Sequence, residues 1–147
     1  MSAADFIAKF EGCAKIGGDG LVYPYLDAVG VPTIGYGHVV PDMRYGPITQ
    51  LEALNILMAD LGYFQGEALR LSPTLEDNPD RLTAITSFCF NLGVHAYENS
   101  TLRKRVDAGD WAAAQTEIVK WNHAGGKVLA GLTLRREAEA QLLKGTP

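Results

Sequence analysis

The sequence predicts an α+β fold with a small N-terminal β-hairpin lobe, a larger helical C-terminal lobe and a long helix that joins them. Three observations support this prediction. The chain opens with a short helical pattern, glycine and turn-forming residues punctuate residues 22–39, and helical periodicity with capping residues dominates residues 49–144. A length of 147 residues fits one domain, residues 1–147, which buries about two-thirds of the surface of its unfolded chain.

The N-terminal part combines one helix with short strands. Apolar residues recur at helical spacing over residues 2–10, and Ser2 begins a pattern similar to a capping box. Short strands are expected over residues 22–26 and 32–39, with turn-forming Gly30 between them. This order predicts a helix followed by a hairpin.

A long amphipathic helix is expected next. Thr49 and Glu52 have the spacing of a capping box, and apolar residues then recur at helical spacing towards Arg70. A helix of this length is able to join two lobes of one domain.

The C-terminal part reads as a series of helices. Asn78, Ser100 and Asp110 each stand where a polar side chain caps a helix N-terminus, and Gly93 and Gly109 stand where helices end. The expected helices cover residues 79–92, 101–108, 111–121 and 132–144.

Composition and charge restrict the possible functions. Hydrophobic residues make up 47% of the chain and charged residues 20%, as in ordinary globular proteins, and no apolar run reaches membrane-spanning length. The first residues lack the basic region of a signal peptide, so the chain is expected to carry neither a secretion signal nor an integral membrane segment. The formal net charge of −4 argues against a nucleic-acid partner.

The basic residues concentrate in the last third of the chain. This distribution favours a locally positive C-terminal lobe on an acidic protein, which suits an anionic partner. The residues concerned are Arg103, Lys104, Arg105, Lys120, Lys127, Arg135 and Arg136.

The cysteines and histidines do not indicate a metal site. Cys13 and Cys89 are too few for a disulfide framework, and two reduced thiols are favoured over a bridge between them. The three histidines lack metal-ligand spacing, and His38 is expected to be structural, as a capping or ion-pairing residue. Neither a metal nor a cofactor is therefore expected.

The candidate catalytic side chains all lie within residues 10–38. Glu11 ends the first helix, Asp27 follows an aromatic pair, and Thr33 opens a segment between glycines. Two carboxylates that face one cleft can divide the work of glycoside hydrolysis, one as a proton donor and the other as an ionised group that handles a water or a developing cation. A hydroxyl can hold that water because it both donates and accepts hydrogen bonds.

These residues resemble the signature of the phage-type lysozymes, the endolysins of glycoside hydrolase family 24. The resemblance rests on Glu11-Gly12, Tyr25-Leu26-Asp27, Gly30 and residues 33–38, and it continues in order through most of the chain. The later motifs are residues 88–93, 99–102, 108–111 and 125–127, then Gly131-Leu132 and residues 135–139. The resemblance implies a catalytic set of Glu11 as general acid, Asp27 as ionised partner and Thr33 as water holder, in a lysozyme-like two-lobe fold.

One departure from the family pattern raises an alternative for the second carboxylate. Fifteen residues, 12–26, separate Glu11 from Asp27, whereas family members usually have roughly eight. The surplus is glycine-rich, and Asp19 stands closer to the usual spacing. Asp27 is favoured because it has the aromatic residue before it and the Gly-x-x-Thr pattern after it.

The resemblance also suggests a substrate-binding set, which comprises Val39, Phe90, Ser100 and Gln115. Phe90 and Val39 are equally well explained as core residues. Arg135 and Arg136 are expected on a helix face, paired with Glu137 or Glu139, or reaching back to orient Glu11.

The function implied is that of an endolysin that hydrolyses the β-1,4 bond between N-acetylmuramic acid and N-acetylglucosamine in peptidoglycan, with inversion, and so lyses the host cell. The implied partner is the peptidoglycan glycan strand, the implied state is a monomer, and the implied location is the host cytoplasm until a holin-dependent release to the cell wall. The alternatives are a lytic transglycosylase, a non-catalytic peptidoglycan-binding or tail-structural module, and a chitinase-like enzyme.

Overall fold

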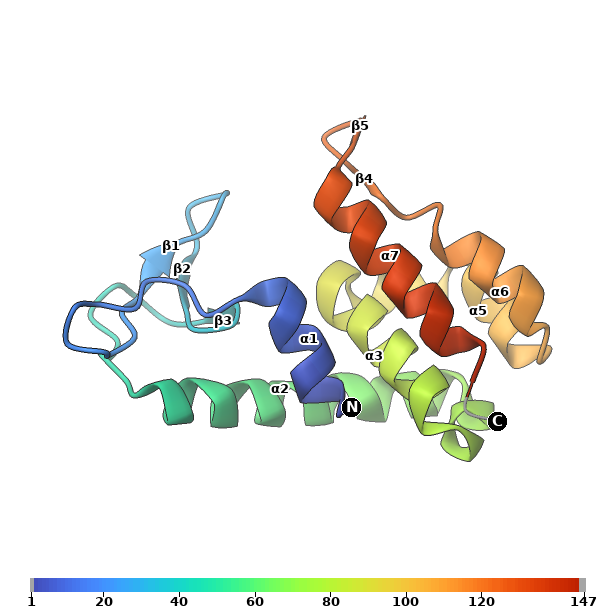
Figure 1. The fold of residues 1–147 in the computed structure, drawn as a ribbon, viewed down its shortest axis with the longest axis horizontal. Coiled ribbons are helices and arrows are strands. Elements are labelled where there is room, and N and C mark those ends of the chain that lie inside the picture. The colour runs from blue at the N-terminus through green and yellow to red at the C-terminus, as the bar shows by residue number, and fades with distance from the viewer. Residues whose placement is uncertain (1, 146–147) are drawn as a thin grey trace. The chain divides into compact units, whose positions relative to one another are not determined.

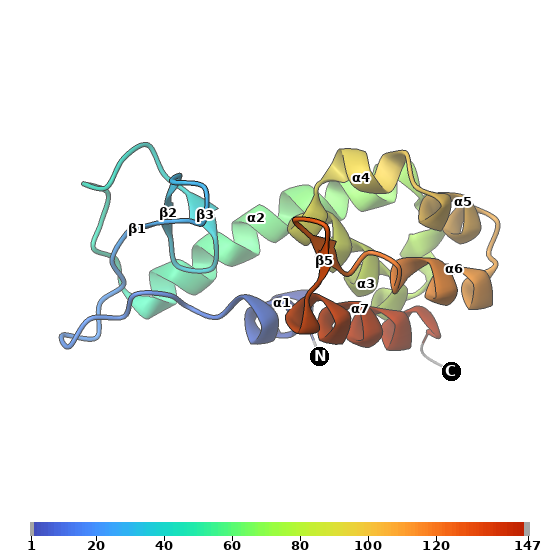
Figure 2. The same ribbon diagram turned by 90° about the horizontal axis from the view of Figure 1, so that it is seen from above.

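The computed structural model describes residues 2–145 and separates into two compact units, Met1–Gly62 and Tyr63–Pro147 (Figures 1 and 2). One helix, α2 (Gln50–Leu71), begins in the first unit and ends in the second. The first unit holds the sheet predicted from sequence, and the second is almost entirely helical. The α+β fold class with two lobes and a long joining helix is therefore confirmed, whereas the assignment of residues 1–147 to one domain stays a prediction.

The first unit begins with the expected helix and a small antiparallel sheet. Its elements are α1 (Ala3–Glu11), β1 (Tyr25–Leu26), β2 (Pro32–Ile34) and β3 (His38–Val39), with strand order β1-β2-β3. The Ser2 hydroxyl accepts a hydrogen bond from the Asp5 N–H at 3.1 Å, which confirms the predicted cap of α1.

The strands are shorter than the sequence predicts. Residues 22–24 are not part of β1: Val22 forms isolated bridges with Ile16 and Ile48 instead, and Pro24 has no N–H for a ladder. The expected strand over residues 32–39 is a hairpin, because Gly35 and Gly37 adopt positive φ and reverse the chain. This turn brings Val39 back beside Thr33.

Helix α2 starts with the predicted capping box. The Glu52 N–H donates to Thr49 Oγ1 at 3.0 Å, and the Thr49 N–H donates to Glu52 Oε1 at 3.1 Å. The first turns of α2 pack Ala53 into the core of the first unit. That core also contains Val22, Ile34, Val40 and Ile48.

The second unit contains the expected helices and three elements that the sequence did not reveal. Its helices are α3 (Pro79–Leu92), α5 (Thr101–Asp107), α6 (Trp111–Ile118) and α7 (Ala130–Leu143), and side chains of Asn78, Ser100 and Asp110 cap the first three. The additional elements are the 3₁₀ helix η1 (Pro73–Asp77), the short helix α4 (Val94–Glu98) and the hairpin of β4 (His123–Ala124) and β5 (Lys127–Val128). Helix α6 ends at Ile118, before the predicted end at residue 121, and the hairpin begins at His123.

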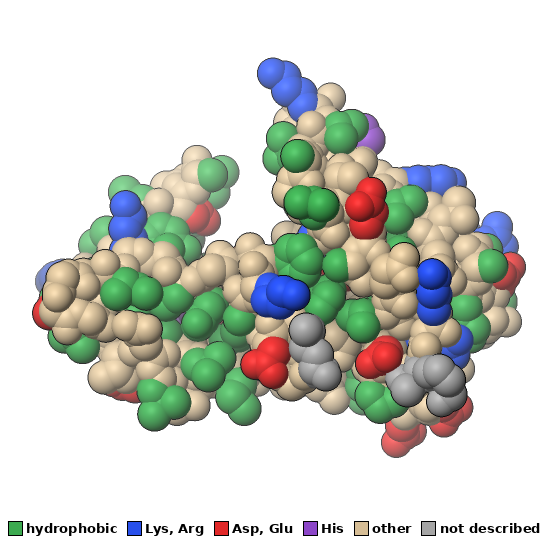
Figure 3. Space-filling model, viewed as in Figure 1, with side chains coloured by type: hydrophobic (Ala, Val, Ile, Leu, Met, Phe, Trp, Pro, Cys, Tyr) green, Lys and Arg blue, Asp and Glu red, His purple; other side chains and the backbone are tan. Residues whose placement is uncertain are grey.

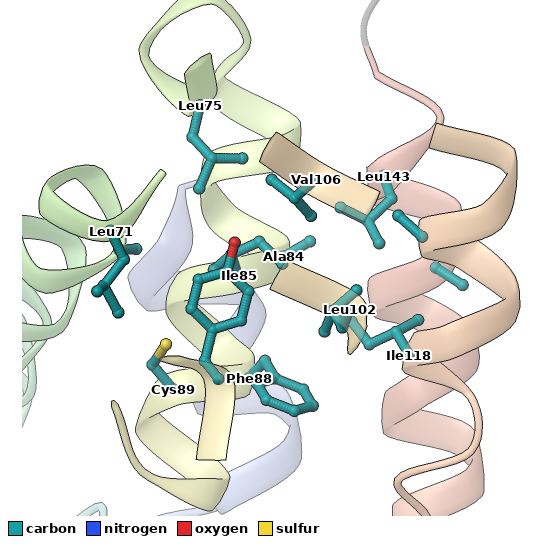
Figure 4. Close-up of a cluster of buried hydrophobic side chains, with 14 residues drawn as sticks. Leu71, Leu75, Ala84, Ile85, Phe88, Cys89, Leu102, Val106, Ile118 and Leu143 are labelled. Atoms are coloured by element: carbon teal, nitrogen blue, oxygen red, sulfur yellow. The ribbon is translucent and has the colours of Figure 1, made fainter. Parts of the chain in front are cut away.

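Packing of α7 against α3 and α6 organises the second unit, as the two ribbon views show (Figures 1 and 2). Fully buried apolar side chains fill the space between these helices and α5, and Figure 4 shows Phe88, Leu102, Ile118 and Leu143 among them. Cys89 belongs to this cluster, and burial raises the pKa of its thiol to about 12. Cys13 and Cys89 are both free thiols, as predicted.

Arg135 and Arg136 lie on one face of α7 and pair with Glu139, as the sequence predicted, and this face is buried in the second unit. Arg136 Nε is 2.7 Å from Glu139 Oε1, and Arg135 Nε is 3.5 Å from Glu139 Oε2. The Ser87 hydroxyl donates to Glu139 Oε2 at 2.5 Å, and Arg136 Nη2 donates to Asn91 Oδ1 at 2.9 Å. Glu139, with an exposed fraction of 0%, is thus the shared anion of two buried guanidinium groups.

This burial changes the expected charge distribution. Residues 63–147 contain ten basic and ten acidic residues, whereas residues 1–62 contain three basic and seven acidic residues. Basic and acidic side chains are interspersed on the face of the second unit in view (Figure 3). Arg135 and Arg136 thus do not contribute exposed charge, and the expectation of a locally positive C-terminal lobe stays a prediction.

Replacement of the buried anion should destabilise the second unit. Glu139→Gln leaves two buried guanidinium groups without their counter-ion, so we expect its free energy of unfolding to fall by about 3 kcal/mol or more. Urea denaturation followed by circular dichroism measures the change. Glu137→Gln is the matched control, because Glu137 lies on the same helix and is exposed; equal losses in the two variants would contradict this account of the buried cluster.

Candidate active site

Glu11 is the last residue of α1, where the helix meets the β2–β3 hairpin. Gly12 ends the helix with φ of +66°, and its N–H donates to Ala8 O at 3.0 Å. A Cβ atom placed on Gly37 would lie 3.9 Å from Glu11 Oε2. The half-buried Glu11 carboxyl therefore reaches the turn between β2 and β3.

Asp27 is held by the turn between β1 and β2. Its Oδ1 accepts hydrogen bonds from the N–H groups of Val29 and Val31, each at 2.9 Å. Among residues 2–145, Oδ2 of Asp27 accepts no hydrogen bond, so one oxygen fixes the carboxylate while the other can take a ligand. Asp27 thus stabilises the turn through Oδ1, as expected of an aspartate before glycine, and its Oδ2 can still accept a hydrogen bond from a ligand.

Thr33 is held by the backbone of the same residue, Val31, that holds Asp27. Its hydroxyl donates to the carbonyl of Val31 at 2.8 Å, and the residue has an exposed fraction of only 3%. Because the hydroxyl proton is used for this bond, the remaining lone pairs of Oγ1 can accept a hydrogen bond. The N–H and the C=O of Val31 therefore hold the two predicted functional side chains of the hairpin.

The register of the sheet brings further residues to the same face. Tyr25 pairs with Thr33, which in turn pairs with Val39, so the three side chains form one cross-strand row. Asp27 extends the ladder beyond β1, because its N–H donates to Val31 O at 3.0 Å, and it lies two residues after Tyr25 on the same face. Val39 has an exposed fraction of 63%, which suits a binding surface better than a core.

Tyr25 stands opposite Thr33 in the register of the sheet. Burial raises the pKa of its phenol, and the negative charges of Glu11, Asp27 and Cys13 raise it further. In the sequence Tyr25 is only part of a motif, because its position opposite Thr33 depends on strand register.

Asp19 has a structural role in the glycine-rich loop. Its Oδ1 accepts from the Leu21 N–H at 3.0 Å, and its Oδ2 accepts a short hydrogen bond from the Tyr23 hydroxyl. These bonds lower the pKa of Asp19, the Tyr23 bond more than the Leu21 bond. Because both oxygens serve the loop, the geometry favours Asp27 over Asp19 as the second carboxylate.

His38 makes the ion-pair contact expected of a structural histidine. Its Nδ1 lies 2.8 Å from Asp60 Oδ2 on α2, and both side chains are half-buried. His38 pairs with Ile34 in the sheet and therefore faces away from the row of Thr33. The contact ties β3 to the long helix behind the hairpin.

Three of the four predicted substrate-binding residues lie in the second unit. Phe90 packs edge-to-face on Phe64 with ring centroids 5.4 Å apart, and the side-chain amide of Gln115 donates to Trp111 O at 3.1 Å. The Ser100 hydroxyl donates to Tyr97 O and accepts from the Arg103 N–H, and thereby caps α5. The contribution of these residues and of Val39 to substrate binding stays a prediction.

The described part of the chain contains neither a metal-binding cluster nor a membrane-spanning helix. Among residues 2–145, no group of three or more His, Cys, Asp or Glu side chains is arranged to hold a metal ion. No helix in the same part of the chain has both the length and the apolar character needed to span a membrane.

Comparison with known proteins identifies the family. A family model described as phage lysozyme matches residues 8–139, which include Glu11, Asp27 and Thr33. The chain belongs to the phage lysozyme family. It is accordingly a glycoside hydrolase of the lysozyme class, and the resemblance inferred from the sequence motifs is confirmed.

Curated relatives of this lysozyme agree with the assignment. The SAR-endolysin of Escherichia phage Mu is 37% identical over 116 residues, which cover 79% of this chain and 67% of the relative. The SAR-endolysin of Enterobacteria phage P21 is 34% identical over 86% of this chain and 79% of its own length. The endolysin of Bacillus phage B103 is 36% identical over 75% of this chain, although the match spans only 42% of that relative.

Solved structures share the fold. The muramidase domain of SpmX from Asticaccaulis excentricus aligns with a TM-score of 0.80 at 28% identity and covers 99% of this chain and 95% of that domain. The endolysin from Escherichia coli O157:H7 phage FAHEc1 aligns with a TM-score of 0.75 at 28% identity, over 96% of this lysozyme and 89% of that chain. The two-lobe lysozyme fold is therefore shared with phage and bacterial proteins.

The anchoring of Asp27 generates a stability prediction. Asp27→Ala removes the acceptor of two backbone N–H groups, so we expect a loss of about 1–2 kcal/mol in the free energy of unfolding of the first unit. Asp27→Asn keeps an acceptor oxygen at the same place and should stay within about 0.5 kcal/mol of the wild type. Urea denaturation compares the variants; an equal loss in both would show that the negative charge, not the acceptor geometry, supports the turn.

Proposed function

We propose that this lysozyme is an endolysin that hydrolyses the β-1,4 bond between N-acetylmuramic acid and N-acetylglucosamine in bacterial peptidoglycan. One observation carries the proposal: the N–H and C=O of Val31 hold Asp27 and Thr33 near one another, and Glu11 reaches the adjoining β2–β3 turn from the end of α1. Membership of the phage lysozyme family and the endolysin relatives support the same substrate.

Glu11 acts as the general acid in this proposal. Cleavage of a glycosidic bond requires a proton on the leaving oxygen, because an alkoxide is a poor leaving group. A carboxylic acid that is half-buried at the end of a helix, beside the hairpin, can meet a sugar oxygen while it remains partly shielded from bulk water. The proton passes from Glu11 to the leaving hydroxyl as the bond to the anomeric carbon breaks.

Asp27 and Thr33 hold and activate the attacking water. Oδ2 of Asp27 and the lone pairs of Thr33 Oγ1 are both hydrogen-bond acceptors, so a water that donates to each of them keeps an oxygen lone pair free for the anomeric carbon. The ionised Asp27 takes the proton as the new C–O bond forms. Water attack from the face opposite the leaving group inverts the configuration, which is the outcome that we propose.

A lytic transglycosylase is the principal alternative among enzymes of similar fold. Such an enzyme needs only the acid, because the substrate's own hydroxyl attacks the anomeric carbon and no water has to be held. The double anchoring of Asp27 and Thr33 on Val31 favours hydrolysis, since it prepares a water site that the alternative does not use.

The cellular role follows from the substrate. We propose that the enzyme acts on peptidoglycan glycan strands as a monomer, stays in the host cytoplasm until lysis, and depends on a holin for its release to the wall. Family membership and the names of the endolysin relatives support a role in host lysis.

Removal of the proton donor should abolish hydrolysis. Glu11→Gln is nearly isosteric, and we expect a fall of at least about 10³-fold in the release of muropeptides from purified sacculi. Mass spectrometry should show that the wild type produces reducing muramic acid ends, not 1,6-anhydro ends, and NMR should show the α-anomer first. Glu137→Gln provides a control for the loss of a distant carboxylate. More than a tenth of wild-type activity in Glu11→Gln would overturn the assignment.

A second pair of variants distinguishes the two aspartates. Asp27→Asn retains the turn acceptor but cannot take a proton, so we expect a loss of about 10²-fold or more. Asp19→Asn, in the glycine-rich loop, should keep at least about half of the activity because Asp19 binds only Leu21 and Tyr23. Initial rates on purified sacculi measure both, and inactivity confined to Asp19→Asn would move the second carboxylate into that loop.

A further inference from the structure

The tip of the β1–β2 hairpin adjoins Asp27 and has no part in the proposed reaction so far. It comprises residues 28–30, all of which are exposed. Val29 has an exposed fraction of 83%, the highest among the large hydrophobic side chains that the structure describes. A single exposed valine is ordinary on a protein surface, so what distinguishes Val29 is how it is held and what surrounds it.

Three hydrogen bonds tie the tip to Asp27. The N–H groups of Val29 and Val31 both donate to Asp27 Oδ1 at 2.9 Å, and the Gly30 N–H donates to Asp27 O at 3.0 Å. The backbone of Val29 is thereby one hydrogen bond away from the carboxylate that we propose as the base. Because a β-branched side chain has few rotamers, the Val29 methyl groups keep a nearly fixed position relative to that carboxylate.

Asp27 supplies the only charge of this hairpin. Residues 20–37 contain no Lys, Arg, His or Glu and no other Asp. The exposed tip beside the carboxylate is apolar, with Ala28 and Val29 as its side chains. Such a surface suits a neutral group that carries a methyl, and it disfavours a group that carries carboxylates of its own, because like charges repel.

The proposed reaction brings a neutral methyl group to this place. The water on Asp27 attacks the anomeric carbon of N-acetylmuramic acid, and the adjacent carbon, C2, carries an acetamido group. The acetamido group is therefore close to the Asp27 carboxylate whenever the sugar is positioned for attack. The stem peptide of peptidoglycan, in contrast, carries carboxylates, so it fits the tip less well.

Resting on the proposed function, we propose that Val29 is a substrate-contacting residue that packs against the acetamido methyl of the N-acetylmuramic acid under attack. The contact costs little conformational entropy, because three hydrogen bonds already fix the tip. It favours the N-acetylated sugar, and it holds C2, and with it the anomeric carbon, in front of the water on Asp27.

The first experiment measures steady-state cleavage of soluble peptidoglycan glycan fragments that carry stem peptides. The wild type is compared with Val29→Ser, which removes both methyl groups, and with Leu26→Ser. Leu26 is a matched control because it is 56% exposed in the same hairpin and pairs with Pro32, on the face of the sheet opposite to Thr33. Urea denaturation confirms that each variant is folded under the assay conditions.

We expect KM to rise by about five- to tenfold in Val29→Ser, while kcat stays within about twofold of the wild type. The reason is that the methyl contact is made in the bound substrate and in the transition state alike. Leu26→Ser should match the wild type. An unchanged KM in Val29→Ser, an equal rise in Leu26→Ser, or a loss confined to kcat would each overturn the contact.

A second measurement locates the sugar directly. The Glu11→Gln variant, labelled on its valine methyl groups, is mixed with the same fragments above the wild-type KM, and nuclear Overhauser effects are recorded. We expect them between the Val29 methyl groups and the acetamido methyl. Contacts from Val29 to alanine methyl groups of the stem peptide instead, or no contact in the bound complex, would overturn the inference. Failure of the wild type to cleave the fragments would overturn the proposed function, and this inference with it.

Discussion

The backbone of Val31 is the constraint on which the proposed site depends. Its N–H donates to Asp27 and its C=O accepts from Thr33, so the two successive peptide groups that flank one residue set the positions of a carboxylate and a hydroxyl that are six residues apart. A change at either side chain alters the turn as well as the chemistry. The hydrogen bonds that close the hairpin thus also orient the two groups that we propose as the water site.

Contacts with α2 and with the glycine-rich loop support the sheet of the first unit. The His38–Asp60 contact ties β3 to α2, while Val22 and Ile48 bridge the glycine-rich loop to the segment before α2. Within the loop, Asp19 accepts hydrogen bonds from Leu21 and Tyr23, so the loop is fixed by its own polar groups. An insertion that satisfies its own polar groups can lengthen a surface connection at low cost.

Much of the fold could be predicted because its signals are local. The capping side chains of Ser2, Thr49, Asn78, Ser100 and Asp110 act within three residues, and the structure confirms all of them. The β4–β5 hairpin was missed because two-residue strands are too short to show alternation. Its Gly125-Gly126 turn, with positive φ at both residues, was the available signal. The pairing of Arg135 and Arg136 with Glu139 was predicted, but their burial was not, because the sequence pattern of a charged helix face does not reveal which neighbours cover it.

The sequence by itself determined the family, the order of the main helices and the identity of Glu11, Asp27 and Thr33 as candidates, because motif spacing and helix caps are properties of neighbouring residues. Only the tertiary structure engaged both oxygens of Asp19 within its own loop, placed Tyr25 opposite Thr33, and buried Arg135 and Arg136 around Glu139. These outcomes depend on strand register, on where the chain reverses and on which side chains exclude water. Such features arise when segments distant in sequence pack together.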